Sequence, residues 1–161
     1  MQTFRIGFGV DVHQLAENHS LIVGGVKIES HLGAVGHSDA DVLLHAICDA
    51  LLGAANLRDI GFHFSDRDPK YKNIDSKILL LNVFKKIQEK QYSVVNIDCT
   101  VVLEQPKLNP IIPKMQAVIA EIIKVEEDAV SIKATTHEKV DSFGECRAIK
   151  AYATVLLSRE V

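Results

Sequence analysis

The strongest constraint on the fold is a run of apolar residues at helical spacing between Asp39 and Ala55. Its apolar positions recur every three or four residues: Val42, Leu43, Ala46, Ile47, Ala50 and Leu51. Ser38 is a good N-cap for this helix, and Asp41 is a capping-box-like partner three residues later. Asp39 and Asp41 also place negative charge where the helix dipole favours it. The pattern predicts a helix over 39–55 with one buried face.

The rest of the chain mixes strand and helix patterns without strict alternation. Gly24-Gly25 lies between two short β-type segments and predicts a tight hairpin turn. We expect strands at 4–13, 21–23, 26–28, 93–103, 130–136 and 149–157, helices at 75–90 and 110–124, and loops at 33–36 and 56–73. This order favours an α+β two-layer sandwich, with helices packed on one face of a mixed sheet.

Length and composition limit the class of protein. The 161 residues fit one domain, 1–161, and the net charge of −3 without a basic stripe argues against nucleic-acid binding. No apolar run approaches the roughly 20 residues that cross a bilayer, so we expect no membrane association. Three scattered cysteines suggest a reducing compartment. We expect a cytoplasmic protein, although a plastid-type protein with its transit peptide removed would have the same features.

The first chemical cluster is Asp11-Val12-His13. On a strand, residues two apart face the same side, so a carboxylate and an imidazole would project together. His45 on the predicted helix is a candidate third ligand, and Asp41 or Asp49, one turn away on either side, could orient its ring. Three such ligands are typical of catalytic zinc. A surface Asp–His pair and a solvated helical histidine are the alternative interpretation.

Three further clusters have both a chemical and a simpler interpretation. His37-Ser38-Asp39 precedes the helix, where free N–H groups attract phosphate, although Ser38 could also simply cap the helix. The acidic stretch 59–69 suits the hydroxyls of a sugar or polyol, or is a plain surface loop. The stretch 133–139 ends in hydroxyls, an imidazole and Glu138, which could hold phosphate and Mg²⁺, although strand ends often carry such residues.

Six stretches occur in order along nearly the whole chain: DVH at 11–13, HSDADVLLHA at 37–46, DALLGAA at 49–55, DIGFHFSDRDP at 59–69, QPKL at 105–108 and KATTHEK at 133–139. Together they resemble the 2-C-methyl-D-erythritol 2,4-cyclodiphosphate synthase family. The resemblance implies a cyclising, CMP-releasing phosphorus–oxygen lyase of isoprenoid precursor biosynthesis by the methylerythritol phosphate pathway. Its substrate is 4-diphosphocytidyl-2-C-methyl-D-erythritol 2-phosphate, whose 2-phosphate attacks the β-phosphorus of the diphosphate.

The resemblance also implies an assembly, cofactors and roles for residues. The family forms homotrimers with sites at the subunit interfaces, one Zn²⁺ per subunit, and Mg²⁺ or Mn²⁺ with the diphosphate. The matched zinc ligands are Asp11, His13 and His45. Glu138 matches the ligand of the second metal, and His37 and Thr136 match the catalytic positions. The matched substrate-binding positions are Ser38, Asp59, Ile60, Gly61, Phe64, Ser65, Asp66, Asp68 and, from the neighbouring subunit's cytidine and phosphate pocket, Leu103, Pro106, Lys107, Leu108, Ala134 and Thr135.

One region departs from the family pattern. The family has Phe-x-Gly-Arg-x-Glu-Gly after its Thr-Thr-x-Glu motif, whereas residues 141–147 here read DSFGECR. Without a gap, the family's Phe falls on Ser142 and its Arg on Glu145. The metal-ligand positions are unaffected.

Two other functions use the same residues. A zinc hydrolase would activate water on the metal, with Glu138 or Asp66 as the base. A non-catalytic trimeric nucleotide-binding protein would bind the cytidine compound without turnover. The products formed from the cytidine substrate distinguish these three hypotheses.

Overall fold

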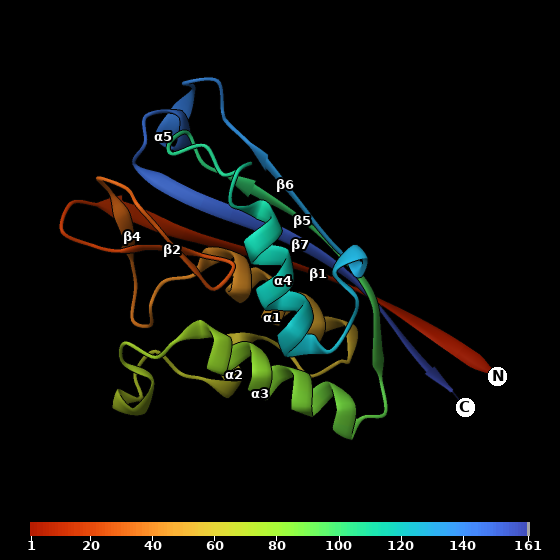
Figure 1. Cartoon of the computed structure of the whole chain (residues 1–161). Coiled ribbons are helices and arrows are strands. Elements are labelled where there is room, and N and C mark those ends of the chain that lie inside the picture. The colour runs from red at the N-terminus through yellow and green to blue at the C-terminus, as the bar shows by residue number, and fades with distance from the viewer. Residues whose placement is uncertain (161) are drawn as a thin grey trace.

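The computed structural model describes residues 1–160, which form a five-stranded sheet, a small hairpin and a layer of helices (Figure 1). The elements in chain order are β1 (Gln2–Ala16), β2 (Leu21–Val23), β3 (Val26–Ile28), β4 (Gly33–Val35), α1 (Val42–Ala54), α2 (Ile60–His63), η1 (Pro69–Tyr71), α3 (Ser76–Glu89), β5 (Ser93–Val102), α4 (Ile112–Ile123), η2 (Glu127–Ala129), β6 (Val130–Thr135), α5 (Asp141–Gly144) and β7 (Ala148–Glu160). Within these residues, no helix combines the length and apolar character needed to cross a membrane.

The sheet has the strand order β4-β1-β7-β5-β6. β5 and β6 pair in parallel, and the other neighbouring pairs are antiparallel, which confirms the predicted α+β fold with a mixed sheet. The register runs straight across four strands, from Asp11 through Ala151 and Val101 to Ala134. This register decides how far apart the predicted site residues lie.

The helices cover one face of the sheet, with α1, α3 and α4 on the same side in Figure 1. On β1 the side chains alternate: Gly7, Gly9 and Leu15 are buried on the helix side. The other side exposes five apolar side chains, which we call the β1 apolar stripe: Phe4, Ile6, Phe8, Val10 and Val12. Ile6 is 75% exposed and Phe8 63%, so a large apolar area faces outward.

Two local predictions are wrong. The helix begins at Val42, and Asp41 caps it instead of Ser38, because the Asp41 carboxylate accepts from Leu44 N at 3.0 Å. The same carboxylate accepts from Gly24 N and Gly25 N at 2.9 and 2.6 Å, so it joins the hairpin turn to α1 and is fully buried. The predicted loop at 33–36 contains β4, which pairs with the end of β1.

Two glycines on β1 allow α1 to lie directly on the strand. A Cβ atom at Gly7 would meet the Ala50 carbonyl oxygen at 1.8 Å, and one at Gly9 would meet the Ala46 carbonyl oxygen at 2.0 Å. Any side chain at these positions would push the helix off the sheet. The close approach fixes the height of α1 above β1, and therefore the position of the residue beside Ala46, His45.

We predict that Gly9→Ala lowers the free energy of unfolding by about 1–3 kcal/mol, because the added methyl group overpacks the α1–β1 contact. Gly53→Ala is the matched control. Gly53 lies in the same helix with open space around its Cβ position, so that variant should be about 0.5–1 kcal/mol more stable than the wild type. Urea unfolding followed by circular dichroism measures both. Equal stability of Gly9→Ala and wild type would contradict the argument.

Candidate metal centre and active site

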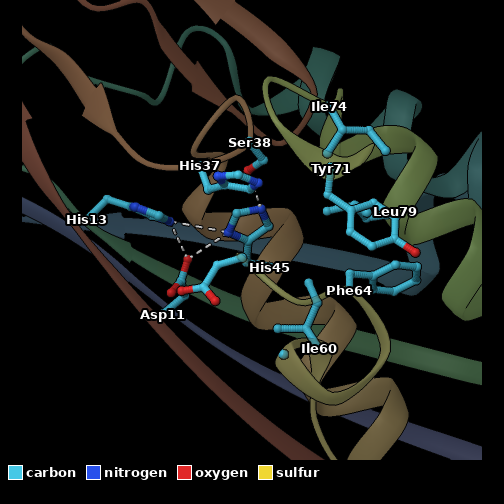
Figure 2. Close-up of a pocket in the computed structure, with 12 residues that line it drawn as sticks. Asp11, His13, His37, Ser38, His45, Ile60, Phe64, Tyr71, Ile74 and Leu79 are labelled. Atoms are coloured by element: carbon cyan, nitrogen blue, oxygen red, sulfur yellow. Dashed lines mark hydrogen bonds and ion pairs between the residues drawn. The ribbon is translucent and has the colours of Figure 1, made fainter. Parts of the chain in front are cut away.

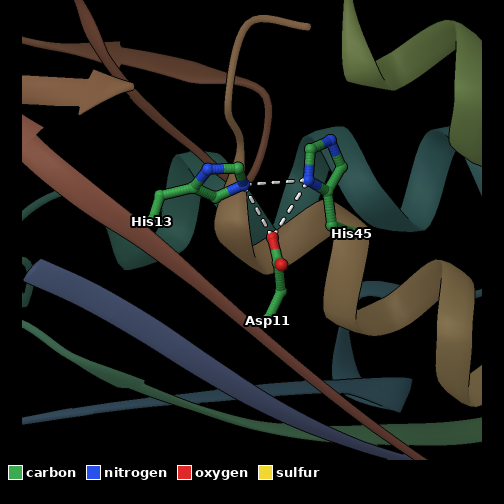
Figure 3. A group of neighbouring side chains, drawn as sticks. All are labelled: Asp11, His13 and His45. Carbon is green, nitrogen blue, oxygen red and sulfur yellow. Dashed lines mark hydrogen bonds and ion pairs between the residues drawn. The ribbon is translucent and has the colours of Figure 1, made fainter. Parts of the chain in front are cut away.

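Three predicted metal ligands converge where the first turn of α1 passes over β1 (Figure 3). Asp11 and His13 are two residues apart on β1, and both side chains face α1, which carries His45. Asp11 Oδ2 lies 2.8 Å from His13 Nε2 and 3.0 Å from His45 Nδ1, and the two nitrogens are 3.2 Å apart. The structure therefore brings together all three residues of the predicted triad.

The donor set fits a metal ion such as zinc. A tetrahedral Zn²⁺ with bonds of about 2.0–2.1 Å holds its ligand atoms about 3.3 Å apart, close to the separations found here. The opposite nitrogen of each ring also has a partner: His13 Nδ1 is 2.9 Å from the Val35 carbonyl oxygen, and His45 Nε2 is 2.8 Å from Ser76 Oγ. Metal-binding histidines are held in this way, by a hydrogen bond at the other nitrogen.

The electrostatics of the triad favour the charged carboxylate. Burial alone would raise the pKa of Asp11, but the hydrogen bonds from His13 and His45 outweigh it and lower the pKa from 3.8 to about 2. Burial would lower the pKa of His13, yet the hydrogen bond and charge of Asp11 raise it overall. The triad places an anionic oxygen beside two imidazoles. In such an arrangement a divalent cation can take the place of the shared protons.

The triad lies at the polar end of a cavity of 430 Å³ (Figure 2). His37 and Ser38 lie beside the triad, and Phe64, Tyr71, Ile74 and Leu79 form the opposite, apolar end. Phe64 and Tyr71 meet edge to face, with ring centroids 5.4 Å apart. A ligand with a charged end and an apolar body fits this division.

Most of the predicted residues from the acidic stretch reach this cavity. Ile60, Gly61, Phe64 and Asp66 line it, together with His37 and Ser38. The other three, Asp59, Ser65 and Asp68, are not among its lining residues. Asp68 caps η1 by accepting from Lys70 N at 3.0 Å, and its carbonyl oxygen lies 3.2 Å from His37 Nε2. The segment is therefore folded around the cavity, and it contains α2 and η1, whereas the sequence predicts a loop over 56–73.

A second cavity, of 300 Å³, gathers the later predicted residues. It is lined by Leu103, Lys107, Leu108, Asn109, Ala134, Thr135 and Thr136. Pro106 is not among these residues, and Asn109, directly after the QPKL stretch, was not predicted. Thr136 Oγ1 donates to Glu138 Oε1 at 2.9 Å, so the predicted catalytic threonine and metal ligand are adjacent.

The two cavities belong to different parts of the sheet. Ala134 is level with Asp11 but three strand spacings away, which is about 14 Å at about 4.8 Å per strand. Thr136 and Glu138 follow directly from that strand. Within one chain, the predicted catalytic pair His37 and Thr136 is therefore divided between two cavities, whose lining residues do not overlap.

The partners of the His45 ring differ from the prediction. Asp41 and Asp49, expected to orient the ring, bond backbone amides instead: Asp41 caps α1, and Asp49 Oδ1 accepts from Ile60 N at 2.7 Å. Ser76 and Ser38 take their place, 2.8 and 3.1 Å from His45 Nε2. Ser76 lies on α3 and shares no local sequence pattern with His45, so it could not be predicted as a partner of this ring.

We predict a pH window for the stability of the metal-free protein. The lowered pKa of Asp11 contributes about 2 kcal/mol above pH 3.8, and this is lost as the pH falls toward 2. The raised pKa of His13 contributes stability that is lost as the pH rises through its folded-state pKa, above 6.5. The free energy of unfolding of wild type minus that of Asp11→Asn should therefore be largest between about pH 4 and 6.5. A difference that is constant from pH 3 to 8 would contradict the shifts.

Comparisons with known proteins agree over almost the entire chain. The model of the YgbB family matches residues 4–158. A 2-C-methyl-D-erythritol 2,4-cyclodiphosphate synthase from Parabacteroides distasonis is 58% identical over 155 residues, which is 96% of each chain.

Solved structures show the same fold. The bifunctional IspDF of Campylobacter jejuni superposes with a TM-score of 0.95 at 38% identity, covering 99% of this chain and 43% of that longer one. IspF of Plasmodium falciparum, solved as a CDP complex, gives 0.86 at 35% identity over 98% of this chain and 97% of that one. This chain belongs to the YgbB family, that of the 2-C-methyl-D-erythritol 2,4-cyclodiphosphate synthases of the methylerythritol phosphate pathway.

Proposed function

We propose that this protein converts 4-diphosphocytidyl-2-C-methyl-D-erythritol 2-phosphate to 2-C-methyl-D-erythritol 2,4-cyclodiphosphate and CMP. An oxygen of the 2-phosphate forms a bond to the β-phosphorus, and the bond from that phosphorus to the oxygen of CMP breaks. The observation that carries the proposal is the convergence of Asp11, His13 and His45 at the polar end of a cavity, in a chain of this family. The protein acts as one domain, 1–161, in the cytoplasm.

The reaction needs positioning more than a protein nucleophile, since both reacting groups belong to the same substrate. Correct placement of such groups contributes about 7–11 kcal/mol. Asp11, His13 and His45 hold one Zn²⁺ per subunit, and Glu138 holds Mg²⁺ or Mn²⁺ with the diphosphate. When bound, these cations supply Lewis-acid stabilisation of charge on phosphoryl oxygens.

The cavity residues bind and orient the substrate. His37 and Thr136 stabilise the transition state by hydrogen bonding, and Ser38 Oγ lies 3.1 Å from His45 Nε2. Asp59, Ile60 and Gly61 contact substrate hydroxyls. The segment 64–68 contributes Phe64, Ser65, Asp66 and Asp68 near the erythritol. The cytidine and phosphate pocket is formed by Leu103, Pro106, Lys107, Leu108, Ala134 and Thr135. The CDP complex of the Plasmodium falciparum relative supports a cytidine nucleotide as the ligand.

A homotrimer completes the site, with each active site formed by two subunits. The separation of about 14 Å between Asp11 and Ala134 supports this, and so does the placement of His37 and Thr136 in different cavities of one chain. The β1 apolar stripe supplies an outward apolar face that a second copy can bury. In a cyclic trimer, the triad of one subunit can face the second cavity of its neighbour.

Incubation of the zinc-loaded protein with the cytidine substrate tests the reaction. Cyclic diphosphate plus CMP is the expected result, read by ³¹P NMR. A ring-opened phosphate product indicates a hydrolase, and binding without turnover indicates a nucleotide-binding protein; either outcome would overturn the proposal.

We expect His45→Ala to lose bound zinc and to lower kcat/KM by about three orders of magnitude, because removal of one ligand leaves an incomplete metal site. Its circular dichroism spectrum should remain that of the wild type. His31→Ala is the matched control, since His31 is exposed and pairs with Glu17 outside both cavities. Metal analysis and the cyclisation assay decide, and full activity of His45→Ala would refute the ligand assignment.

We further predict that two inactive variants restore activity when they are co-expressed. His45→Ala destroys the triad side of the site, and Glu138→Ala destroys the second-cavity side. In mixed trimers about a quarter of the interfaces combine two intact halves, so about a quarter of wild-type activity should return. Each variant alone, and the two proteins mixed without subunit exchange, serve as controls. No recovery in purified mixed trimers would show that each site lies within one chain.

A further inference from the structure

The two nitrogens of the His45 ring have separate sets of partners. Nδ1 faces Asp11 Oδ2 and His13 Nε2, whereas Nε2 faces two serine hydroxyls. The closer hydroxyl belongs to Ser76, the first residue of α3, at 2.8 Å. Ser76 is fully buried and is not among the residues that line the cavity, so it is not placed to contact substrate.

Asp39 determines the direction of the hydrogen bond between Ser76 and His45. Asp39 Oδ1 accepts from the Ser76 hydroxyl, and Asp39 Oδ2 accepts from Ser76 N at 3.0 Å. A hydroxyl has one proton, and a carboxylate can only accept. Because the Ser76 proton is committed to Asp39, the Ser76 oxygen can only accept from His45 Nε2–H.

We propose that Ser76, held by Asp39, is a positioning residue that keeps the proton of His45 on Nε2 and so directs the Nδ1 lone pair to the metal. This inference rests on the metal site of the proposed function. A neutral imidazole can ligate a metal through either nitrogen, and the hydrogen bond at the other nitrogen selects which one. Ser76 thus selects the metal-binding nitrogen of His45, as the Val35 carbonyl does for His13.

The backbone around Ser76 makes this arrangement rigid. Asp39 N donates to the Ile74 carbonyl at 3.1 Å, and Asn73 N donates to the His37 carbonyl at 2.7 Å. The loop before α1 and the start of α3 are therefore joined at several points. Ser38, 3.1 Å from Nε2, has no comparable support: its hydroxyl accepts from Ala40 N at 3.2 Å, and no carboxylate among residues 1–160 fixes its proton.

Ser76→Ala tests the proposal through metal affinity. We expect its zinc affinity, measured by competition with a chromophoric chelator, to be about 10–100-fold weaker than that of the wild type. The matched control is Ser158→Ala, which removes a serine of low exposure from β7 and should bind zinc as the wild type does. Equal affinities of Ser76→Ala and the wild type would overturn the proposal.

A spectroscopic signature separates positioning from a general loss of structure. In the zinc-loaded wild type with ¹⁵N-labelled histidine, the His45 Nε2–H proton should be protected from solvent exchange, and Ser76→Ala should lose that protection. A wild-type spectrum with the proton on Nδ1 and the metal on Nε2 would overturn the proposal even if Ser76→Ala does not fold. Zinc binding without cyclisation would instead overturn the proposed function and leave the role of Ser76 intact.

Discussion

The candidate metal centre depends on the direct contact between α1 and β1. Because Gly7 and Gly9 have no side chains, the carbonyl oxygens of Ala50 and Ala46 occupy the space where Cβ atoms would lie. Backbone packing therefore holds His45 over Asp11 and His13, independently of any attraction among the three side chains. Closely packed protein interiors have low compressibility, so the contact between α1 and β1 is rigid. A rigid contact suits side chains that must converge on one cation.

Much of the fold could be predicted from the sequence, because most elements have a strong local pattern. The long helices and strands follow apolar periodicity, and the Gly24-Gly25 turn follows from its residue type. The two wrong predictions, the helix cap and the loop at 33–36, concern features that depend on contacts between distant segments. Asp41 replaces Ser38 as the cap, since its carboxylate accepts from Leu44 N and also from the hairpin amides of Gly24 and Gly25. β4 forms because it pairs with the end of β1. Neither partner is visible in a local window.

The same division holds for the candidate site. Strand alternation placed Asp11 beside His13, and helix periodicity placed His45 apart from the buried apolar stripe, so the triad could be predicted. The partners of the His45 ring could not. Aspartates one turn away were available, but backbone amides bind them, and the ring uses Ser76 from a later helix. The apolar end of the cavity similarly includes Tyr71 and Leu79, brought in by the fold of an irregular segment.

The sheet keeps the two cavities of one chain apart. Hydrogen-bonded strands keep a fixed spacing, so Asp11 and Ala134, at the same level of the sheet, stay about 14 Å apart. The outward face of the sheet is apolar on β1 and polar on β5 and β6, where Asp98 and Lys133 form an ion pair. Burial of the apolar half is favourable only against another apolar surface, and a second copy offers one. The rigidity that separates the two cavities thus favours the proposed assembly that would reunite them.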